Sequence, residues 1–254
     1  MTTELPLTIS IGTGTASDQE IDRFARIANA WWDPDGAFRA LHRLNPLRAA
    51  YVRDQLCRHF GREIGADRPL AGIRIIDVGC GGGLLSEALA RMGATVVGID
   101  AEVESIGIAT AHAAQEGLAI DYRLALPEDL AAAGERFDAV VSMEVIEHVA
   151  DVAAFTAAVR ALVRPEGAVV IATLNRTLKS LALAKIGAEY VLRWVPIGTH
   201  DWRKFVKPSE LATVFRRNRL ALGDLAGFEY DVLGGTWTLS RDLAVNYVAF
   251  AVPA

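Results

Sequence analysis

The sequence predicts an α/β fold built on a mostly parallel sheet of seven strands, with helices on both faces and an antiparallel C-terminal strand. Two observations predict it. Short apolar runs rich in β-branched residues alternate with helical stretches from Ile73 onward, as in a parallel sheet covered on both sides. A glycine-rich turn follows the first of these runs, at the edge where open α/β sheets bind ligands.

The composition favours one globular domain of a cytosolic protein. The chain has 254 residues, of which 52% are hydrophobic and 22% are charged. A net charge of -5 argues against nucleic-acid binding, which needs a basic surface. The two cysteines, Cys57 and Cys80, and the absence of a secretory signal pattern indicate a reducing compartment. No apolar run reaches the roughly 18 residues of a membrane-spanning helix.

The domain layout follows from local composition. Residues 1–16 are small and Thr-rich, which predicts a flexible tail, and residues 17–254 are expected to form a single domain. Within it, residues 17–64 form a helical cap before the sheet, and residues 175–207 form an apolar and basic insertion or lid.

The helical cap is expected to contain two helices. Ser17 begins a capping-box pattern, and Pro34 stops the first helix. Asn45 is predicted to cap the second helix, with Pro46 at its first position and Gly61 after its end. We expect this cap to cover a bound cofactor.

The predicted elements of the sheet region then follow in order. The strand-like runs are residues 73–78, 94–99, 119–125, 137–143, 168–174, 236–240 and 245–254. Helical stretches are expected at residues 84–92, 102–116 and 151–163, with a short helix from Pro208.

The glycine-rich turn is the strongest ligand signal. Glycine permits positive φ and close approach of the backbone to a ligand, and the following helix offers free N–H groups. Asp100 ends the next strand, where a carboxylate can accept hydrogen bonds from ribose. A dinucleotide fingerprint requires a later glycine, but Leu84 and Ser86 occupy the two possible positions. A Walker lysine is also missing, which disfavours ATP by that route.

The run from Asp77 to Gly83 reads D-x-G-x-G-x-G and resembles the nucleotide loop of class I methyltransferases that use S-adenosylmethionine. The resemblance implies their Rossmann-like fold and their cofactor. It also implies that the Asp77, Gly79 and Gly81 region packs on the methionine part of the cofactor, while Asp100 binds the ribose.

Four further stretches, "WWDPDGAFRALHRLNPLR", "MEVIEHV", "TLNRTLKS" and "GAEYVLRWVPIGTHDWRKFVKPSEL", are similar to the ubiquinone biosynthesis O-methyltransferase family in its bacterial form. The resemblance covers nearly the whole chain. It implies methyl transfer to phenolic oxygens of polyprenylated catechol and hydroquinone intermediates, in both O-methylations of the pathway. The matching cofactor positions are Arg48, Gly79, Asp100 and Met143. From spacing alone, Arg48 would instead be a solvated charge on a helix.

The motif "MEVIEHV" carries the candidate catalytic groups, Glu144 and His148. A base there would remove the proton of a phenol, whose ordinary pKa is about 10. If the segment is helical, Glu144, Glu147 and His148 share one face and could instead hold a divalent ion such as Mg²⁺, as the eukaryotic relatives imply. A third interpretation is an ordinary acidic helix start with His148 at the surface.

The segment 175–207 holds seven basic and two acidic residues, a local charge of +5. Its apolar run with Lys185, Arg193 and Trp194 suits an anionic membrane surface, although a lid packed on the core is an equal alternative. We therefore expect a cytoplasmic protein associated peripherally with the inner face of the membrane. Its partners would be a polyprenylated phenol or quinol, lipid, and other enzymes of ubiquinone biosynthesis.

Other functions stay open from the sequence: a class I methyltransferase with another acceptor, or a cofactor-binding protein without catalysis that acts in assembly. A dehydrogenase would require the loop to tolerate the missing glycine.

Overall fold

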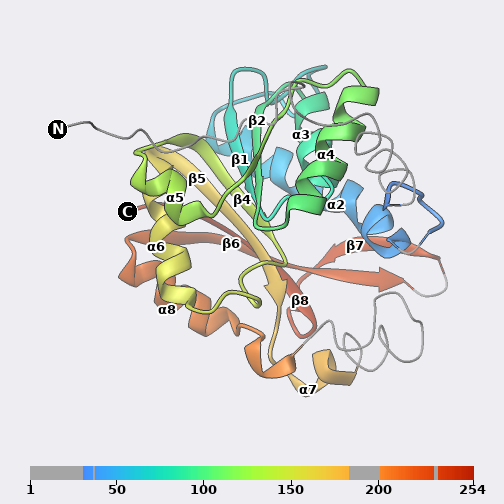
Figure 1. The fold of residues 1–254 in the computed structure, drawn as a ribbon. Coiled ribbons are helices and arrows are strands. Elements are labelled where there is room, and N and C mark those ends of the chain that lie inside the picture. The colour runs from blue at the N-terminus through green and yellow to red at the C-terminus, as the bar shows by residue number, and fades with distance from the viewer. Residues whose placement is uncertain (1–30, 37, 183–200, 232–233) are drawn as a thin grey trace.

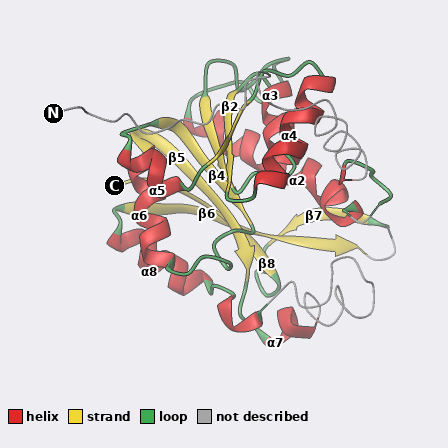
Figure 2. Ribbon diagram, in the orientation of Figure 1, coloured by secondary structure: helices red, strands yellow, loops and turns green. Residues whose placement is uncertain are grey.

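The computed structural model describes residues 31–36, 38–182, 201–231 and 234–254. The predicted tail at residues 1–16, the capping box at Ser17 and most of the segment 175–207 lie outside these ranges. The described chain forms one twisted sheet with helices on both faces (Figures 1 and 2), which confirms the predicted fold class.

The sheet has eight strands in the order β3-β2-β1-β4-β5-β8-β6-β7. The strands are β1 (Arg74–Val78), β2 (Thr95–Asp100), β3 (Asp121–Leu124), β4 (Phe137–Met143), β5 (Val163–Leu174), β6 (Leu220–Asp231), β7 (Thr236–Ser240) and β8 (Asn246–Pro253). The first five run parallel to one another, whereas β8 is antiparallel to both of its neighbours and β7 is antiparallel to β6.

Helices cover both faces, as the apolar strands require. They are α2 (Arg39–His59), α3 (Leu84–Arg91), α4 (Val103–Gln115), α5 (Pro127–Ala132), α6 (Val152–Leu162), α7 (Leu178–Ser180), the short 3₁₀ turn η2 (Trp202–Lys204) and α8 (Pro208–Arg217). One buried apolar cluster joins the sheet to α2 and α3, and a second joins it to α5, α6 and α8 on the opposite side (Figure 1). The sheet is therefore apolar on both faces, and its polar chemistry is concentrated at its edges.

The sequence pattern did not reveal the short helix α5 or strand β6, so the predicted count of seven strands is one too low. The residues of β6 alternate poorly, and Gly223 and Gly227 weaken any strand signal. Backbone pairing with β8 and β7 decides its conformation, and these partners are distant from its start in the sequence.

Helix α2 also differs from the prediction, because it begins at Arg39 and passes through Asn45 and Pro46. The side-chain amide of Asn45 does not cap a helix and instead donates a 2.9 Å hydrogen bond to the carbonyl of Leu84. The helix end was predicted correctly: α2 stops at His59, and Gly61 follows with φ 62°.

The strand order reverses between β1 and β4, since the chain moves outward to β3 and then returns to pair β4 with the other side of β1. Ligand crevices of open α/β sheets lie at the carboxyl ends of such strands. The residues after Val78 and after Met143 are therefore adjacent at this edge.

Candidate functional site

The glycine loop after β1 has a backbone that only glycine adopts easily. Gly79, Gly81 and Gly83 have φ values of 73°, 53° and 92°. A Cβ atom on Gly79 would lie 2.3 Å from Cγ2 of Val145. The loop is thus in direct contact with the segment that carries Glu144, Glu147 and His148.

Two aspartates stabilise the glycine loop and the start of the helix that follows it. The carboxylate of Asp100 accepts hydrogen bonds from the backbone N–H groups of Gly81 and Glu102, each at 2.9 Å. Asp77 is buried and accepts a 2.6 Å hydrogen bond from the Ser86 hydroxyl. Burial raises the pKa of Asp77 to about 6, and the nearby charge of Asp100 adds to that shift. Asp77 therefore supports the loop from within the core, whereas Asp100 lies at the crevice.

Arg48 and Glu144 form an ion pair that links α2 to the residue after the end of β4. Arg48 is only 7% exposed, so it is not a solvated helix charge. Glu144 has φ 52°, an uncommon backbone conformation for a non-glycine residue. This turn directs the chain out of β4 immediately after Met143, which is partly buried beside the core.

Glu147 lies deeper than the sequence pattern suggested. It is 2% exposed, and its Oε2 atom accepts a 2.9 Å hydrogen bond from the hydroxyl of Thr173. Its Oε1 atom has no hydrogen-bond partner among the described residues. Burial, assisted by the charge of Glu144, raises the pKa of Glu147 to about 7.

His148 lies at the exposed end of the same segment. The chain from Glu144 to His148 forms a turn and not a helix, closed by a 2.8 Å hydrogen bond from the N–H of His148 to the carbonyl of Val145. The condition for one shared helix face is therefore not met. Over the ranges that the structure describes, no three His, Cys, Asp or Glu side chains are grouped as metal ligands would be. Since Arg48 already pairs with Glu144, these three side chains as arranged do not fit a ready Mg²⁺ site.

Trp31 and Trp32 lie against the glycine loop, although the sequence pattern did not single them out as site residues. A Cβ on Gly82 would lie 2.7 Å from the Trp31 ring, and Trp32 donates a 3.0 Å hydrogen bond to the Gly82 carbonyl. The two adjacent aromatic residues before a helix-stopping proline were the available signal.

Comparison with known proteins shows which family this chain is similar to. A family model described as a methyltransferase domain matches residues 48–225, which include the loop and the segment after β4. The chain is 52% identical to a ubiquinone biosynthesis O-methyltransferase from Brucella ovis, covering 93% of this chain and 96% of the relative. It is also 52% identical to the protein of the same description from Methylobacterium sp. (strain 4-46), covering 96% and 98%.

Solved structures share the fold. The magnesium protoporphyrin IX methyltransferase from Synechocystis PCC 6803 with bound SAH superposes with a TM-score of 0.61 at 21% identity, covering 93% of this chain and 95% of that chain. An S-adenosylmethionine-dependent methyltransferase from Clostridium acetobutylicum gives 0.57 at 11% identity, covering 92% and 98%. Within the described ranges, none of the helices combines the length and the apolar character needed to cross a bilayer.

Proposed function

The chain belongs to the ubiquinone biosynthesis O-methyltransferase family, and from that premise we propose that it methylates phenolic hydroxyls of polyprenylated catechol and hydroquinone intermediates. It is an S-adenosylmethionine-dependent O-methyltransferase. The proposal covers both O-methylations of the pathway, 2-polyprenyl-6-hydroxyphenol methylation and 3-demethylubiquinol 3-O-methylation.

One observation carries the proposal: the acidic segment after β4 rests on the glycine loop through the Val145–Gly79 contact. Groups able to accept a proton therefore border the loop that would hold the methyl donor. Asp100, Gly79, Gly81, Met143 and Arg48 are the proposed cofactor contacts, with Asp77 supporting the loop. The positive φ glycines and a carboxylate at the end of β2 fit a nucleoside there.

The chemistry needs a nucleophilic phenolate and an aligned methyl group. S-adenosylmethionine supplies a methyl group on a positively charged sulfur, which leaves as a neutral thioether. His148 is the proposed base that takes the phenol proton, because it lies at the exposed side of the segment where a ring can approach. Glu144, the second candidate catalytic group, is held by its ion pair with Arg48, which fixes the start of this turn beside the cofactor loop.

The test uses purified protein, S-adenosylmethionine labelled in its methyl group, and catechol and hydroquinone acceptors with a short prenyl tail. We expect a labelled methyl ether by mass spectrometry. His148→Ala should lower kcat about 100-fold at pH 7.5. This loss should shrink toward pH 9.5, because the phenol then ionises without help.

The matched control is His59→Ala, because His59 is exposed and its Nε2–H donates a 2.9 Å hydrogen bond to the backbone carbonyl of Glu166, outside the candidate site. It should keep wild-type kcat. Cofactor binding without methylation of either acceptor would contradict the proposed substrate class and favour another acceptor or a non-catalytic role. An equal loss for His148→Ala at both pH values would contradict the base assignment.

The magnesium alternative for Glu144, Glu147 and His148 is tested separately, and no step above depends on it. Activity after dialysis against a chelator is compared with activity after Mg²⁺ is restored. Activity that returns only with Mg²⁺ would favour the ion, and unchanged activity after chelation would favour a metal-free base.

We also propose peripheral association with an anionic membrane surface at its cytoplasmic face, where a polyprenyl tail and other enzymes of the pathway would be met. Within the described ranges, the apolar side chain of Leu178 in α7 is 77% exposed, which supports the proposal. The neighbouring Lys179 does not add to it, because its ammonium group is paired with Asp242. Charge removal at Lys185, Arg193 and Lys204 should reduce pelleting with anionic vesicles, and added salt should reduce wild-type pelleting. Equal pelleting of the variant and wild type would reject this proposal. Neutralising Arg58, Arg216 and Arg217 removes the same charge elsewhere and serves as the control.

A further inference from the structure

The glycine loop has a second anchor that comes from the N-terminal side of the chain. The indole Nε1–H of Trp32 donates a 3.0 Å hydrogen bond to the carbonyl oxygen of Gly82. The N–H of the following residue, Gly83, donates a 3.0 Å hydrogen bond to the carbonyl of Cys80. The peptide unit that joins Gly82 to Gly83 is therefore held at both its oxygen and its nitrogen, immediately before helix α3 begins.

The Trp32 ring is itself held by a histidine from another helix. It stacks on the imidazole of His112 with ring centroids 3.6 Å apart and an interplanar angle of 2°. His112 lies in the last turn of α4, and its side chain is 14% exposed. The stack thus connects two segments that are eighty positions apart in the sequence and gives the indole one orientation toward the loop.

The imidazole in turn has a fixed orientation. Its Nδ1 atom lies 2.7 Å from Oε1 of Glu87, which is completely buried in the first turn of α3. Because a carboxylate only accepts hydrogen bonds, Nδ1 carries the proton. The other carboxylate oxygen accepts a 3.0 Å hydrogen bond from Arg91. Glu87 therefore sets the plane of His112, and His112 sets the plane of Trp32.

We propose that Trp32 is a positioning residue for the cofactor loop, and that His112 and Glu87 hold it in place. A loop of several glycines loses much conformational freedom when it binds a ligand. Fixing the Gly82–Gly83 peptide in advance lowers that entropic cost, so the stack contributes to cofactor affinity without touching the reacting atoms.

The critical variant is Trp32→Phe, which keeps an aromatic ring against His112 and removes the N–H donor to Gly82. Affinity for the demethylated cofactor, measured by calorimetry, should fall about three- to tenfold. Trp202→Phe is the matched control, because Trp202 donates a 2.8 Å hydrogen bond to the carbonyl of Thr177, away from the loop. Its cofactor affinity should stay within about twofold of wild type.

His112→Gln tests the contribution of the histidine that stacks on Trp32. Glutamine retains a donor for Glu87 but removes the ring beneath Trp32. We expect a similar loss of cofactor affinity, and the double variant should lose clearly less than the two single losses multiplied together, because both act on one peptide. Losses that multiply fully would contradict a shared action.

Kinetics separate positioning from general damage to the fold. Trp32→Phe should raise the KM for S-adenosylmethionine, while kcat at saturating cofactor and the KM for the phenol stay within about twofold. Unchanged cofactor affinity, or a fall in kcat with unchanged cofactor KM, would overturn the inference. It rests on the proposed function only through the cofactor: calorimetry needs no phenol, so a wild-type protein that binds cofactor but methylates no phenol would leave this inference intact.

Discussion

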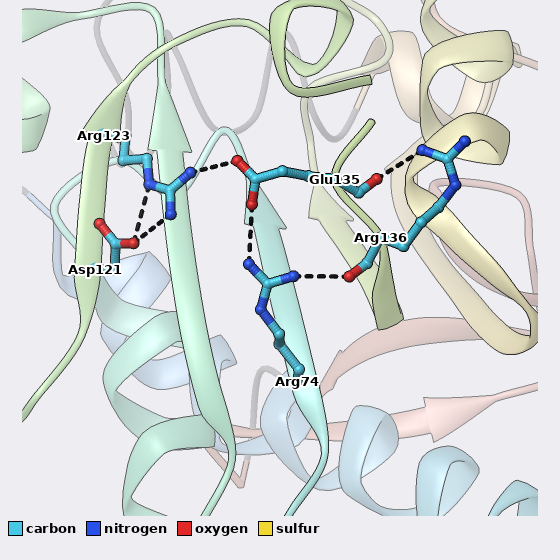
Figure 3. A network of polar contacts seen from close by, with 5 residues as sticks. All are labelled: Arg74, Asp121, Arg123, Glu135 and Arg136. Carbon is cyan, nitrogen blue, oxygen red and sulfur yellow. Dashed lines mark hydrogen bonds and ion pairs between the residues drawn. The ribbon is translucent and has the colours of Figure 1, made fainter. Parts of the chain in front are cut away.

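Two charged regions of this protein differ in how completely their polar groups are paired. In the Glu135 network (Asp121, Arg123, Glu135, Arg74 and Arg136), the carboxylate of Glu135 binds Arg123 at 2.6 Å and Arg74 at 2.9 Å (Figure 3). Arg123 also binds Asp121, and the Arg74 guanidinium reaches the Arg136 carbonyl at 2.7 Å. In contrast, at the carboxyl edge of the sheet the buried Oε1 of Glu147 and Nε of Arg48 have no hydrogen-bond partners among the described residues.

This difference distinguishes charged side chains that stabilise the fold from charged side chains that can take part in chemistry. The Glu135 network is partly exposed and joins β1, β3 and the turn before β4, so its charges are solvated as well as paired. At the carboxyl edge, burial and like charges raise the pKa values of Glu147 and Asp77. Unpaired buried groups cost stability, and they cluster where function requires them.

The largest effect is expected for Gly79→Ala. The substitution forces φ 73° on a residue with a Cβ and places that atom 2.3 Å from Cγ2 of Val145. Either the loop or the acidic segment must move, so affinity for S-adenosylmethionine should fall more than about 100-fold, measured by calorimetry.

Gly117→Ala is the control for that variant. Gly117 has φ 67°, and nothing lies within 4 Å of the position where its Cβ would be. It should cost about 1 kcal/mol of stability and leave cofactor affinity intact. Similar affinities for the two alanine variants would show that the contact between loop and segment is unimportant.

Glu147→Gln should produce the next largest effect, on stability. The folded pKa of Glu147 is about 7, above its ordinary value, so its protonated form stabilises the fold below about pH 4.5. That contribution is lost as the pH rises from about 4.5 toward 7, because the carboxyl ionises in the unfolded chain while it is still protonated in the folded protein. Glutamine resembles the protonated form, so the variant should match wild type near pH 4.5.

At pH 8 the same variant should be more stable than wild type by about 2 kcal/mol, measured by urea unfolding across the pH range. A difference between the two proteins that stays constant from pH 4.5 to pH 8 would contradict the assignment of a raised pKa to this side chain.

The smallest effect is expected for Glu135→Gln in the fully paired region. Its partners Arg74 and Arg123 are partly exposed, so the free energy of unfolding should fall by only about 0.5–1 kcal/mol. Cofactor affinity should not change. A loss of cofactor affinity would show that the two regions are coupled and that the contrast between them does not hold.

The sequence predicted the strands and the loop that local residue patterns determine. Strands β1, β2, β4 and β5 appear as apolar runs because most of their residues are buried. The loop with Asp100 was found because glycine and acid occupy fixed positions after strands. Strand β6 was missed because its pairing partners decide it. The helix start at Asn45 was wrong because that side chain is used by the Leu84 carbonyl.

Within the site, the sequence identified Glu144, Glu147 and His148 but not their arrangement. Residues at positions i, i+3 and i+4 lie on one face only in a helix, and the chain forms a turn here. The Trp32–His112 stack joins residues with no periodic relation, and the ion pair of Arg48 with Glu144 joins α2 to β4. Such contacts depend on the tertiary fold, which residue spacing alone does not contain.

The position of β8 has a consequence for how the molecule is made. Residues 246–253 follow β6 and β7 in the chain but lie between β5 and β6 in the sheet. During synthesis, the N-terminal nucleotide-binding half can form early, whereas the β6–β7 hairpin has no strand that joins it to the rest of the sheet until this last strand emerges from the ribosome. A nascent chain that is stalled before Asn246 would expose the open side of β5 and depend on chaperones until it is completed.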